Sequence, residues 1–251
     1  MRNFLIYFAI KYSGDFDKIY QAIINKELVE QKDIEQIKRS NISAVTILDL
    51  EYPNSLKTCY KPPFVLFYKG DISLLNSESI AVVGSRYPSE YAIKATKYII
   101  EGLFSKKDIT IISGLAYGID TIAHIEALHH NQKTIAVLGC GIDSCYPKEN
   151  INLKKEIENI GLVISEYPFK CQCKKENFRM RNRIISALSK GVLVTSAQSK
   201  SGTRITVNYA LEQGKNIFTI PYSIFEESYC NELLKSGAIP ICNGEDLLEN
   251  L

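Results

Sequence analysis

The chain has 251 residues, which is enough for one large domain or for a core domain with a small appendage. Its hydrophobic fraction of 45% is typical of a globular protein with a substantial core, and no apolar run reaches the roughly 18 residues that predict a transmembrane helix. Thirty basic and 28 acidic residues give a net charge of +2, so nucleic-acid binding would have to depend on a local basic patch.

The N-terminal part predicts short helices. Ile19, Ile23 and Ile24 recur at helical spacing, and no strand-like alternation interrupts them. The opening segment MRNFLIYFAIKYSGDF is broken by Lys11 and is followed by no small-residue cleavage site, so we interpret it as a core helix and expect a cytoplasmic protein. We expect a small helical module over residues 1–48.

A proline-punctuated stretch follows, from Glu51 to Asp71, and it carries an extended apolar run, Phe64 to Tyr68. Proline clusters of this kind mark connections between structural units. We therefore expect residues 49–78 to be a connector.

From residue 79 the pattern changes to alternating strands and helices. The predicted strands are Ile80–Gly84, Ile109–Gly114, Thr134–Gly139, Leu162–Glu166, Val192–Ser196 and Ile217–Pro221, and the predicted helices are Ser89–Ser105, Ile119–His130, Asn150–Ile160, Asn177–Ser189 and Thr203–Gln213. Short apolar runs that end in small residues and lead into helices are typical of a parallel sheet covered on both faces. We predict an α/β fold with a doubly wound, mostly parallel, Rossmann-like sheet over residues 79–251.

The turns after these strands are rich in small residues: Gly84–Arg86, Ser113–Asp120, Gly139–Gly141 and Ser199–Thr203. In open α/β sheets, ligands bind outside the carboxyl ends of the strands. Glycine lets backbone N–H groups approach an anion closely, and a helix N-terminus favours negative charge. The turns therefore predict an anion-binding edge.

The anion is not predicted to be a common cofactor. The first turn reads GSRYPS instead of G-x-G-x-x-G, the second strand ends without an acidic residue, and no GxxxxGK[ST] motif is present. These features disfavour NAD, FAD and ATP, and we expect no cofactor. Arg86, inside the first turn, indicates a ligand with phosphate outside the usual pyrophosphate position.

Catalytic and metal signatures are weak. Asp120 and His124 lie four apart on one predicted helix and could share a hydrogen bond, but we interpret them as a helix N-terminal acid and a structural imidazole. No GxSxG motif and no His/Glu pair with metal-ligand spacing occurs. The seven cysteines form no CxxC pair, so we expect reduced thiols and no metal site.

The stretch NFRMRNRIISALS places Arg179, Arg181 and Arg183 ahead of an apolar run. They either cap and solvate an ordinary helix or present a cationic edge to an anion. Ile185 and its apolar neighbours are expected core contacts. Arg181, four residues before Ile185, is expected to be partly buried and paired with Glu166, whereas Arg179 fits either interpretation.

Together, the motifs resemble the DNA-processing protein A family (DprA, also called Smf). The resemblance runs from about Leu50 to the C-terminus and comprises, in order, GSR, SGLAYGIDTIAH, TIAVLGCGIDSCYPKEN, LVISEYP, F-x-x-RNRIISALS, SGT-x-IT, ALEQGKNIFTIP and CNELLKSGA. The N-terminal helices are compatible with the sterile-alpha-motif-like module of many members. The chain stops at Leu251, and we expect no C-terminal winged-helix module.

The resemblance implies a homodimer that binds single-stranded DNA without strong sequence preference. It also implies a recombination mediator that protects incoming strands in natural transformation and loads a RecA-type recombinase. The DNA-binding residues that it and the turns indicate are Gly84, Ser85, Arg86, Ser113, Gly114, Lys175, Phe178, Arg181, Arg183 and Gly202, and the implied dimer contacts are Leu233 and Leu234. Arginine and lysine would neutralise phosphates, and Phe178 would stack on bases.

Two other functions remain open. A LOG-like phosphoribohydrolase carries a GGxGT-x-x-E motif, but here Thr206 stands in place of the glutamate and Lys200 or Ser201 in place of the first glycine. A nucleotide-sensing module would bind a mononucleotide tightly and would not respond to oligonucleotide length. The chain also departs from the DprA pattern at Arg204, usually small or apolar, and at Tyr222, usually glycine.

Overall fold

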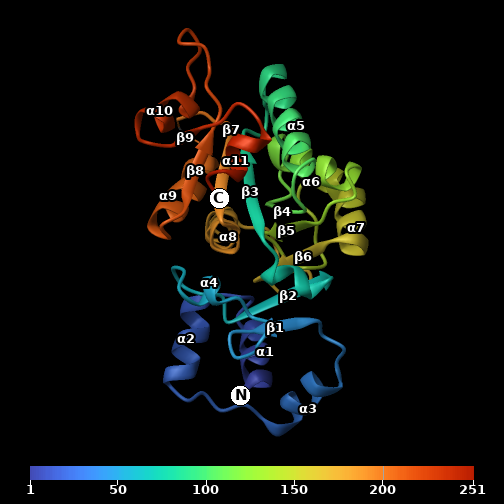
Figure 1. Ribbon diagram of the computed structural model, residues 1–251. Helices are drawn as coiled ribbons and strands as arrows, with labels where there is room; N and C mark the ends of the chain where they lie inside the picture. The colour runs from blue at the N-terminus through green and yellow to red at the C-terminus, as the bar shows by residue number, and fades with distance from the viewer. Residues whose placement is uncertain (200) are drawn as a thin grey trace.

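A computed structural model describes residues 1–199 and 201–251. Within these residues, nine strands form one sheet in the order β1-β2-β6-β5-β4-β3-β7-β8-β9 (Figure 1). The strands are β1 (Ala44–Thr46), β2 (Val65–Gly70), β3 (Ser79–Gly84), β4 (Thr110–Ser113), β5 (Thr134–Leu138), β6 (Leu162–Ser165), β7 (Gly191–Ser196), β8 (Asn216–Thr219) and β9 (Ile239–Pro240).

Helices alternate with most of these strands along the chain. They are α1 (Arg2–Lys11), α2 (Phe16–Ile24), α3 (Gln31–Arg39), α4 (Asn54–Lys57), α5 (Glu90–Phe104), α6 (Ile119–His129), α7 (Ile151–Ile160), α8 (Lys175–Leu188), α9 (Gly202–Glu212), α10 (Tyr229–Lys235) and α11 (Gly244–Leu248), with the short 3-10 helices η1 (Ile72–Asn76) and η2 (Lys148–Asn150). No helix among the described residues is long and apolar enough to cross a membrane.

The strands from β6 through β3 to β9 are parallel, and the side on which the chain adds successive strands changes at β3. The chain adds β4, β5 and β6 on one side of β3, and then returns to add β7, β8 and β9 on the other. Such a reversal is the topological switch point at which doubly wound sheets bind ligands. The predicted Rossmann-like α/β fold is confirmed.

Both faces of the parallel sheet are covered by helices, as Figure 1 shows. Successive side chains of a strand point to opposite faces. Ile80 and Val82 of β3 belong to the core cluster formed with α5 and α6, whereas Ala81 and Val83 belong to the cluster formed with α8 and α9. This burial on both faces explains why the strands are continuous apolar runs and do not alternate with polar residues.

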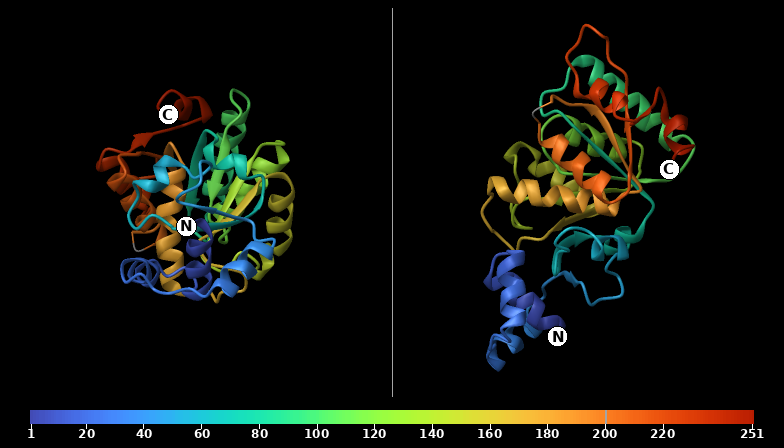
Figure 2. Two further views of the ribbon diagram at one scale, coloured as in Figure 1. Left: turned by 90° about the horizontal axis from the view of Figure 1, so that it is seen from below. Right: turned by 90° about the vertical axis from the view of Figure 1, so that its left-hand side faces the viewer.

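The sheet runs across both expected domain boundaries, at 48/49 and at 78/79. β1 and β2 are antiparallel additions beside β6, so the expected connector 49–78 supplies a strand, and the apolar run at Phe64–Tyr68 belongs to it. Helix α1 shares a core cluster with Val163 of β6. The N-terminal helices lie at the opposite end of the molecule from α10 (Figures 1 and 2).

Candidate nucleic-acid interface

A cleft of about 610 Å³ opens at the switch point, between the carboxyl ends of β3 and β7. The turn after β3 supplies Gly84 to Tyr87, α8 supplies a wall, and the start of α9 supplies Gly202 and Thr203. The cleft therefore lies where the sequence placed the anion-binding edge. Lys200, one of the residues compared with the phosphoribohydrolase motif, lies outside the described residues.

The turn that carries Arg86 is held by backbone contacts. The N–H of Ser85 donates to the carbonyl of Ser196, the last residue of β7 (2.7 Å), and the carbonyl of Ser85 accepts from the N–H of Ile119 at the start of α6 (3.1 Å). Gly118 allows this approach, because its φ is 72° and a Cβ there would lie 2.2 Å from the Ser85 carbonyl oxygen. The Arg86 side chain consequently projects, exposed, from a fixed turn.

Helix α8 forms the wall of the cleft through residues spaced three and four apart. Lys175, Phe178, Arg179 and Asn182 line the cleft, and this spacing places them on one helix face. Lys175 and Arg179 are exposed, and Phe178 lies half-buried between them. The structure thus assigns Arg179, which the sequence left open, to the cleft.

Three exposed cations among the described residues border the cleft. Among the described residues, no carboxylate forms an ion pair with Arg86, Lys175 or Arg179, although many surface lysines elsewhere are paired. Unpaired cations that surround an open cleft can neutralise the phosphates of a strand without first giving up an internal contact.

Arg181 forms part of the cleft floor and is buried. Its Nη1 donates to the backbone carbonyls of Gly114 (2.6 Å) and Val137 (2.5 Å) at the ends of β4 and β5. Position 114 must be glycine for this arrangement, since a Cβ would lie 2.0 Å from Arg181 Nη1. Burial lowers the pKa of Arg181, and the nearby Asp120 carboxylate opposes that shift.

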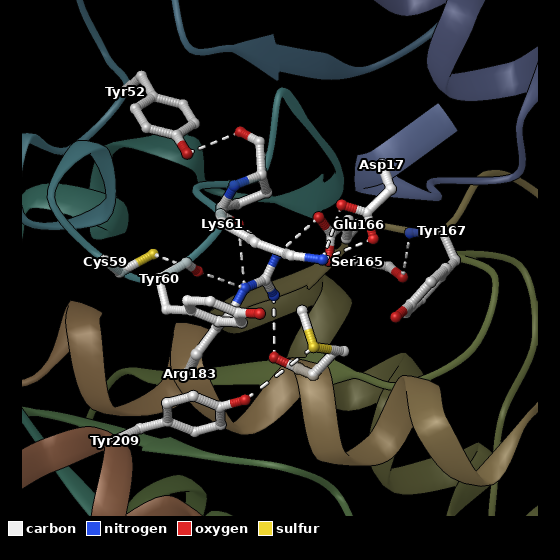
Figure 3. A network of polar contacts seen from close by, with 12 residues as sticks. Asp17, Tyr52, Cys59, Tyr60, Lys61, Ser165, Glu166, Tyr167, Arg183 and Tyr209 are labelled. Carbon is white, nitrogen blue, oxygen red and sulfur yellow. Dashed lines mark hydrogen bonds and ion pairs between the residues drawn. The ribbon is translucent and has the colours of Figure 1, made fainter. Parts of the chain in front are cut away.

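Arg183 does not line the cleft, and its predicted place in the DNA groove is corrected here. Its side chain is 0% exposed and donates from Nη2 to both carboxylate oxygens of Glu166 (2.7 and 2.9 Å) (Figure 3). The predicted Arg181–Glu166 pair is therefore wrong. Helical residues are about 100° apart, so Arg183 turns away from the cleft-facing position of Asn182 toward the connector.

The connector completes the shell around Arg183. Nε donates to the carbonyl of Tyr60 (2.9 Å), Nη2 donates to the carbonyl of Lys61 (2.7 Å), and Nη1 donates to the carbonyl of Met180 within α8 (2.9 Å). The Lys61 ammonium in turn donates a hydrogen bond to the Asp17 carboxylate of α2 (Figure 3). One buried guanidinium thus ties α8 to the connector, next to the N-terminal helices.

Phe178 packs closely over the end of β5. A Cβ on Gly139 would lie 2.6 Å from Cδ1 of the Phe178 ring, so the glycine leaves the space that the ring occupies. The ring centroid lies 5.3 Å from that of Tyr146, with 52° between the planes. Asn182 lines the cleft and Tyr146 packs against its wall, and the sequence interpretation missed both; the spacing of Asn182 from Phe178 was the available signal for that residue.

Several other predicted residues have supporting roles. Ser113 is fully buried, and its hydroxyl donates to the carbonyl of Val82 (2.7 Å), so it fixes β4 against β3 and does not line the cleft. Leu233 belongs to the protein core, which corrects its assignment to a dimer surface. Leu234 is half-buried and remains available at the surface of α10.

Asp120 and His124 do not form a pair. One Asp120 carboxylate oxygen accepts from the N–H groups of Gly114 (3.1 Å) and Ala116 (3.3 Å), while His124 Nδ1 contacts the Thr134 hydroxyl (2.7 Å). Burial raises the pKa of Asp120 and lowers the pKa of His124 to about 3. These contacts fit the expected roles of a helix N-terminal acid and a structural imidazole, and Asp120 also lines the cleft.

The fold and the site define a class: a Rossmann-like α/β protein with an open, cationic cleft at its switch point. Comparison with known proteins specifies the family. The model of the DNA recombination-mediator protein A family matches residues 43–251. The chain belongs to this family, as its motifs indicated.

Individual relatives agree with that membership. The DNA processing protein DprA of Streptococcus pneumoniae is 44% identical over 205 residues, which cover 81% of this chain and 72% of that protein. DprA of Bacillus subtilis is 35% identical over 244 residues, which cover 94% of this chain and 82% of that protein.

Solved structures show the same fold. The S. pneumoniae DprA structure superposes with a TM-score of 0.83 at 36% identity and covers 99% of this chain and 93% of its own. A DprA structure from Helicobacter pylori, described for its single-stranded DNA binding mode, has a TM-score of 0.74 at 31% identity and covers 83% of this chain and 95% of its own.

Proposed function

We propose that this protein binds single-stranded DNA without sequence preference in the switch-point cleft. The observation that carries the proposal is the placement of Arg86, Lys175 and Arg179, all exposed and unpaired among the described residues, around the half-buried ring of Phe178. Cations supply phosphate contacts, and an aromatic face accepts any base. The H. pylori relative, described for its single-stranded DNA binding mode, supports the same ligand.

The proposed cellular role is that of a recombination mediator in the cytoplasm, which protects incoming single strands and loads a RecA-type recombinase during DNA uptake. The family description, DNA recombination-mediator protein A, supports this role. Binding without catalysis fits the cleft, because Thr206 faces it where a phosphoribohydrolase would need a carboxylate.

Replacing both Arg86 and Lys175 with alanine should weaken single-stranded DNA binding and reduce its salt dependence. Each phosphate contact contributes about 0.7 to the slope of log K against log salt for a single strand, so losing two contacts should lower the slope by about 1.4. Fluorescence anisotropy with labelled single- and double-stranded oligonucleotides, titrated at several salt concentrations, measures both quantities. Lys94→Ala with Lys155→Ala, two exposed lysines that do not line the cleft, is the matched control.

Equal affinity for single and double strands, or an unchanged slope in the double variant, would contradict the proposal. The alternatives give different results in the same experiments. A nucleotide-sensing module would bind a mononucleotide as tightly as an oligonucleotide, and a phosphoribohydrolase would release free base from nucleoside monophosphates.

We also propose that the protein is a homodimer that associates through the surface of α10. Leu234 lies on this helix, and the loop that precedes it leaves Ile224 and Phe225 89% and 92% exposed. Exposed apolar side chains that gather in one region mark interaction surfaces.

Leu234→Asp should convert the dimer to a monomer, because a carboxylate would be buried without a partner in the interface. Size-exclusion chromatography with light scattering measures the mass. Leu211→Asp, which changes a leucine of α9 that is 59% exposed, should leave the mass unchanged. A Leu234→Asp protein that remains folded and dimeric would exclude this surface.

A further inference from the structure

Three tyrosines follow three neighbouring strands at the carboxyl edge of the sheet. Tyr87 follows β3, Tyr117 follows β4 and Tyr146 follows β5, and these strands are adjacent in the order β5-β4-β3. Neighbouring strands lie about 4.8 Å apart, and parallel strands end at the same edge. The turns that carry these tyrosines, here called the tyrosine row, therefore lie side by side from the cleft, which Tyr87 lines, toward β5.

Contacts join Tyr146 to the cleft wall and Tyr117 to the loop after β5. The Tyr146 ring lies against Phe178, the aromatic residue of the cleft wall, at 5.3 Å between centroids. The Tyr117 hydroxyl donates to Glu149, in the segment that carries Tyr146, so the loops after β4 and β5 are held together. This bond raises the pKa of Tyr117 to about 12, to which the neighbouring Tyr146 and Tyr87 add smaller contributions.

The two outer tyrosines have no evident role in the fold. Tyr87 is 87% exposed and Tyr146 is 47% exposed. Neither hydroxyl forms a hydrogen bond with a described residue, and neither ring belongs to one of the core clusters. A single exposed aromatic side chain is ordinary, but several in a row beside a cationic cleft form a surface suited to stacking.

Resting on the proposed function, we infer that Tyr146 and Tyr87 extend the stacking surface of Phe178, so that a single strand leaves the cleft along the carboxyl edge of the sheet. In this arrangement the bases stack on the tyrosine rings, and the cations at Arg86 and Lys175 bind the phosphates. Glu149 fits this orientation, because its carboxylate accepts a hydrogen bond from the Tyr117 hydroxyl and would repel a phosphate on that side.

Tryptophan fluorescence tests the inference directly, because the chain contains no tryptophan. Tyr146→Trp introduces a single tryptophan, and stacking on a base should quench its fluorescence when unlabelled oligo(dT) of about 12 nucleotides saturates the protein. Tyr98→Trp, at a position that is 61% exposed on α5, should show no quenching. An abasic strand of the same length should bind through its phosphates and should not quench the fluorescence of either tryptophan variant.

Affinity provides the second measurement. Tyr146→Ala should weaken binding of a strand of about 12 residues by about fivefold or more, the equivalent of one stacked base, while binding of a strand of about 4 residues should not change. Tyr146→Phe keeps the ring and should restore the affinity for the longer strand. Because Tyr146 contacts Phe178, this rescue separates stacking by the ring from a general disturbance of the cleft wall.

The outcomes distinguish this inference from the proposed function. If the unmodified protein binds single strands but Tyr146→Trp is not quenched at saturation, or Tyr146→Ala binds the longer strand with unchanged affinity, the row is not part of the site and the cleft alone binds DNA. If the unmodified protein fails to bind single strands, the proposed function fails together with the inference.

Discussion

Replacing Arg183 with alanine is expected to destabilise the folded protein by about 3–5 kcal/mol, the usual cost of removing one partner of a buried ion pair. The Glu166 carboxylate, only 5% exposed, would remain buried without its partner. The carbonyls of Tyr60 and Lys61 would lose a donor at the same time. Urea denaturation, followed by circular dichroism, measures the change in the free energy of unfolding.

Two further variants make this test specific. Arg179→Ala removes an exposed arginine from the same helix and should change the free energy of unfolding by no more than about 0.5 kcal/mol. Combining Arg183→Ala with Glu166→Ala should cost less than the sum of the two single changes, because the second removes the unpaired charge. If Arg183→Ala proves as mild as Arg179→Ala, the buried ion pair described here does not stabilise the protein.

Phe178→Ala is expected to produce the largest loss of DNA affinity from a single change. Stacking on one aromatic ring contributes about 1–3 kcal/mol per base, which corresponds to about 5- to 150-fold in the dissociation constant. The effect should be independent of sequence, because every base has a stacking face. Anisotropy titration with oligo(dT) and mixed-sequence strands measures it, and Phe178→Trp should retain affinity.

An abasic strand provides the control for mechanism. It keeps the phosphates but has no base to stack, so Phe178→Ala and the unmodified protein should bind it equally. Phe4→Ala, which changes a phenylalanine of α1 that is 38% exposed and does not line the cleft, should not affect either strand. A Phe178→Ala protein that binds oligo(dT) with unchanged affinity would show that the ring only packs over Gly139.

The fold could be predicted from the sequence because its signals are local. Each central strand is a short apolar run that ends at a small residue and is followed by a helix, and a sheet covered on both faces needs this pattern. The helix that carries Phe178 was expected at Asn177 and begins at Lys175, which is within the usual uncertainty of helix ends. The strand at Ala44–Thr46 was missed because its pairing with β2 is not local.

The candidate site was predicted less completely, and the arginines of α8 show why. Sequence spacing gives the angle between Arg181 and Arg183 around a helix, but not which side of the helix faces the cleft. That side depends on the connector, because the carbonyls of Tyr60 and Lys61 accept hydrogen bonds from Arg183. Lys61 and Arg183 are 122 residues apart in the sequence. Tyr146 was missed for a similar reason, since only the folded loop after β5 brings it to Phe178.

The continuous sheet also limits how this protein can be divided. β2 pairs with β6 along its outer edge, with Phe67 opposite Ser165 and Gly70 opposite Leu162. A fragment that began at the expected boundary, residue 79, would leave that edge of β6 bare, together with the apolar surface that α1 covers. Exposed apolar strand edges pair with other chains and aggregate. By covering this edge of β6, the N-terminal residues therefore hinder aggregation of the protein through it.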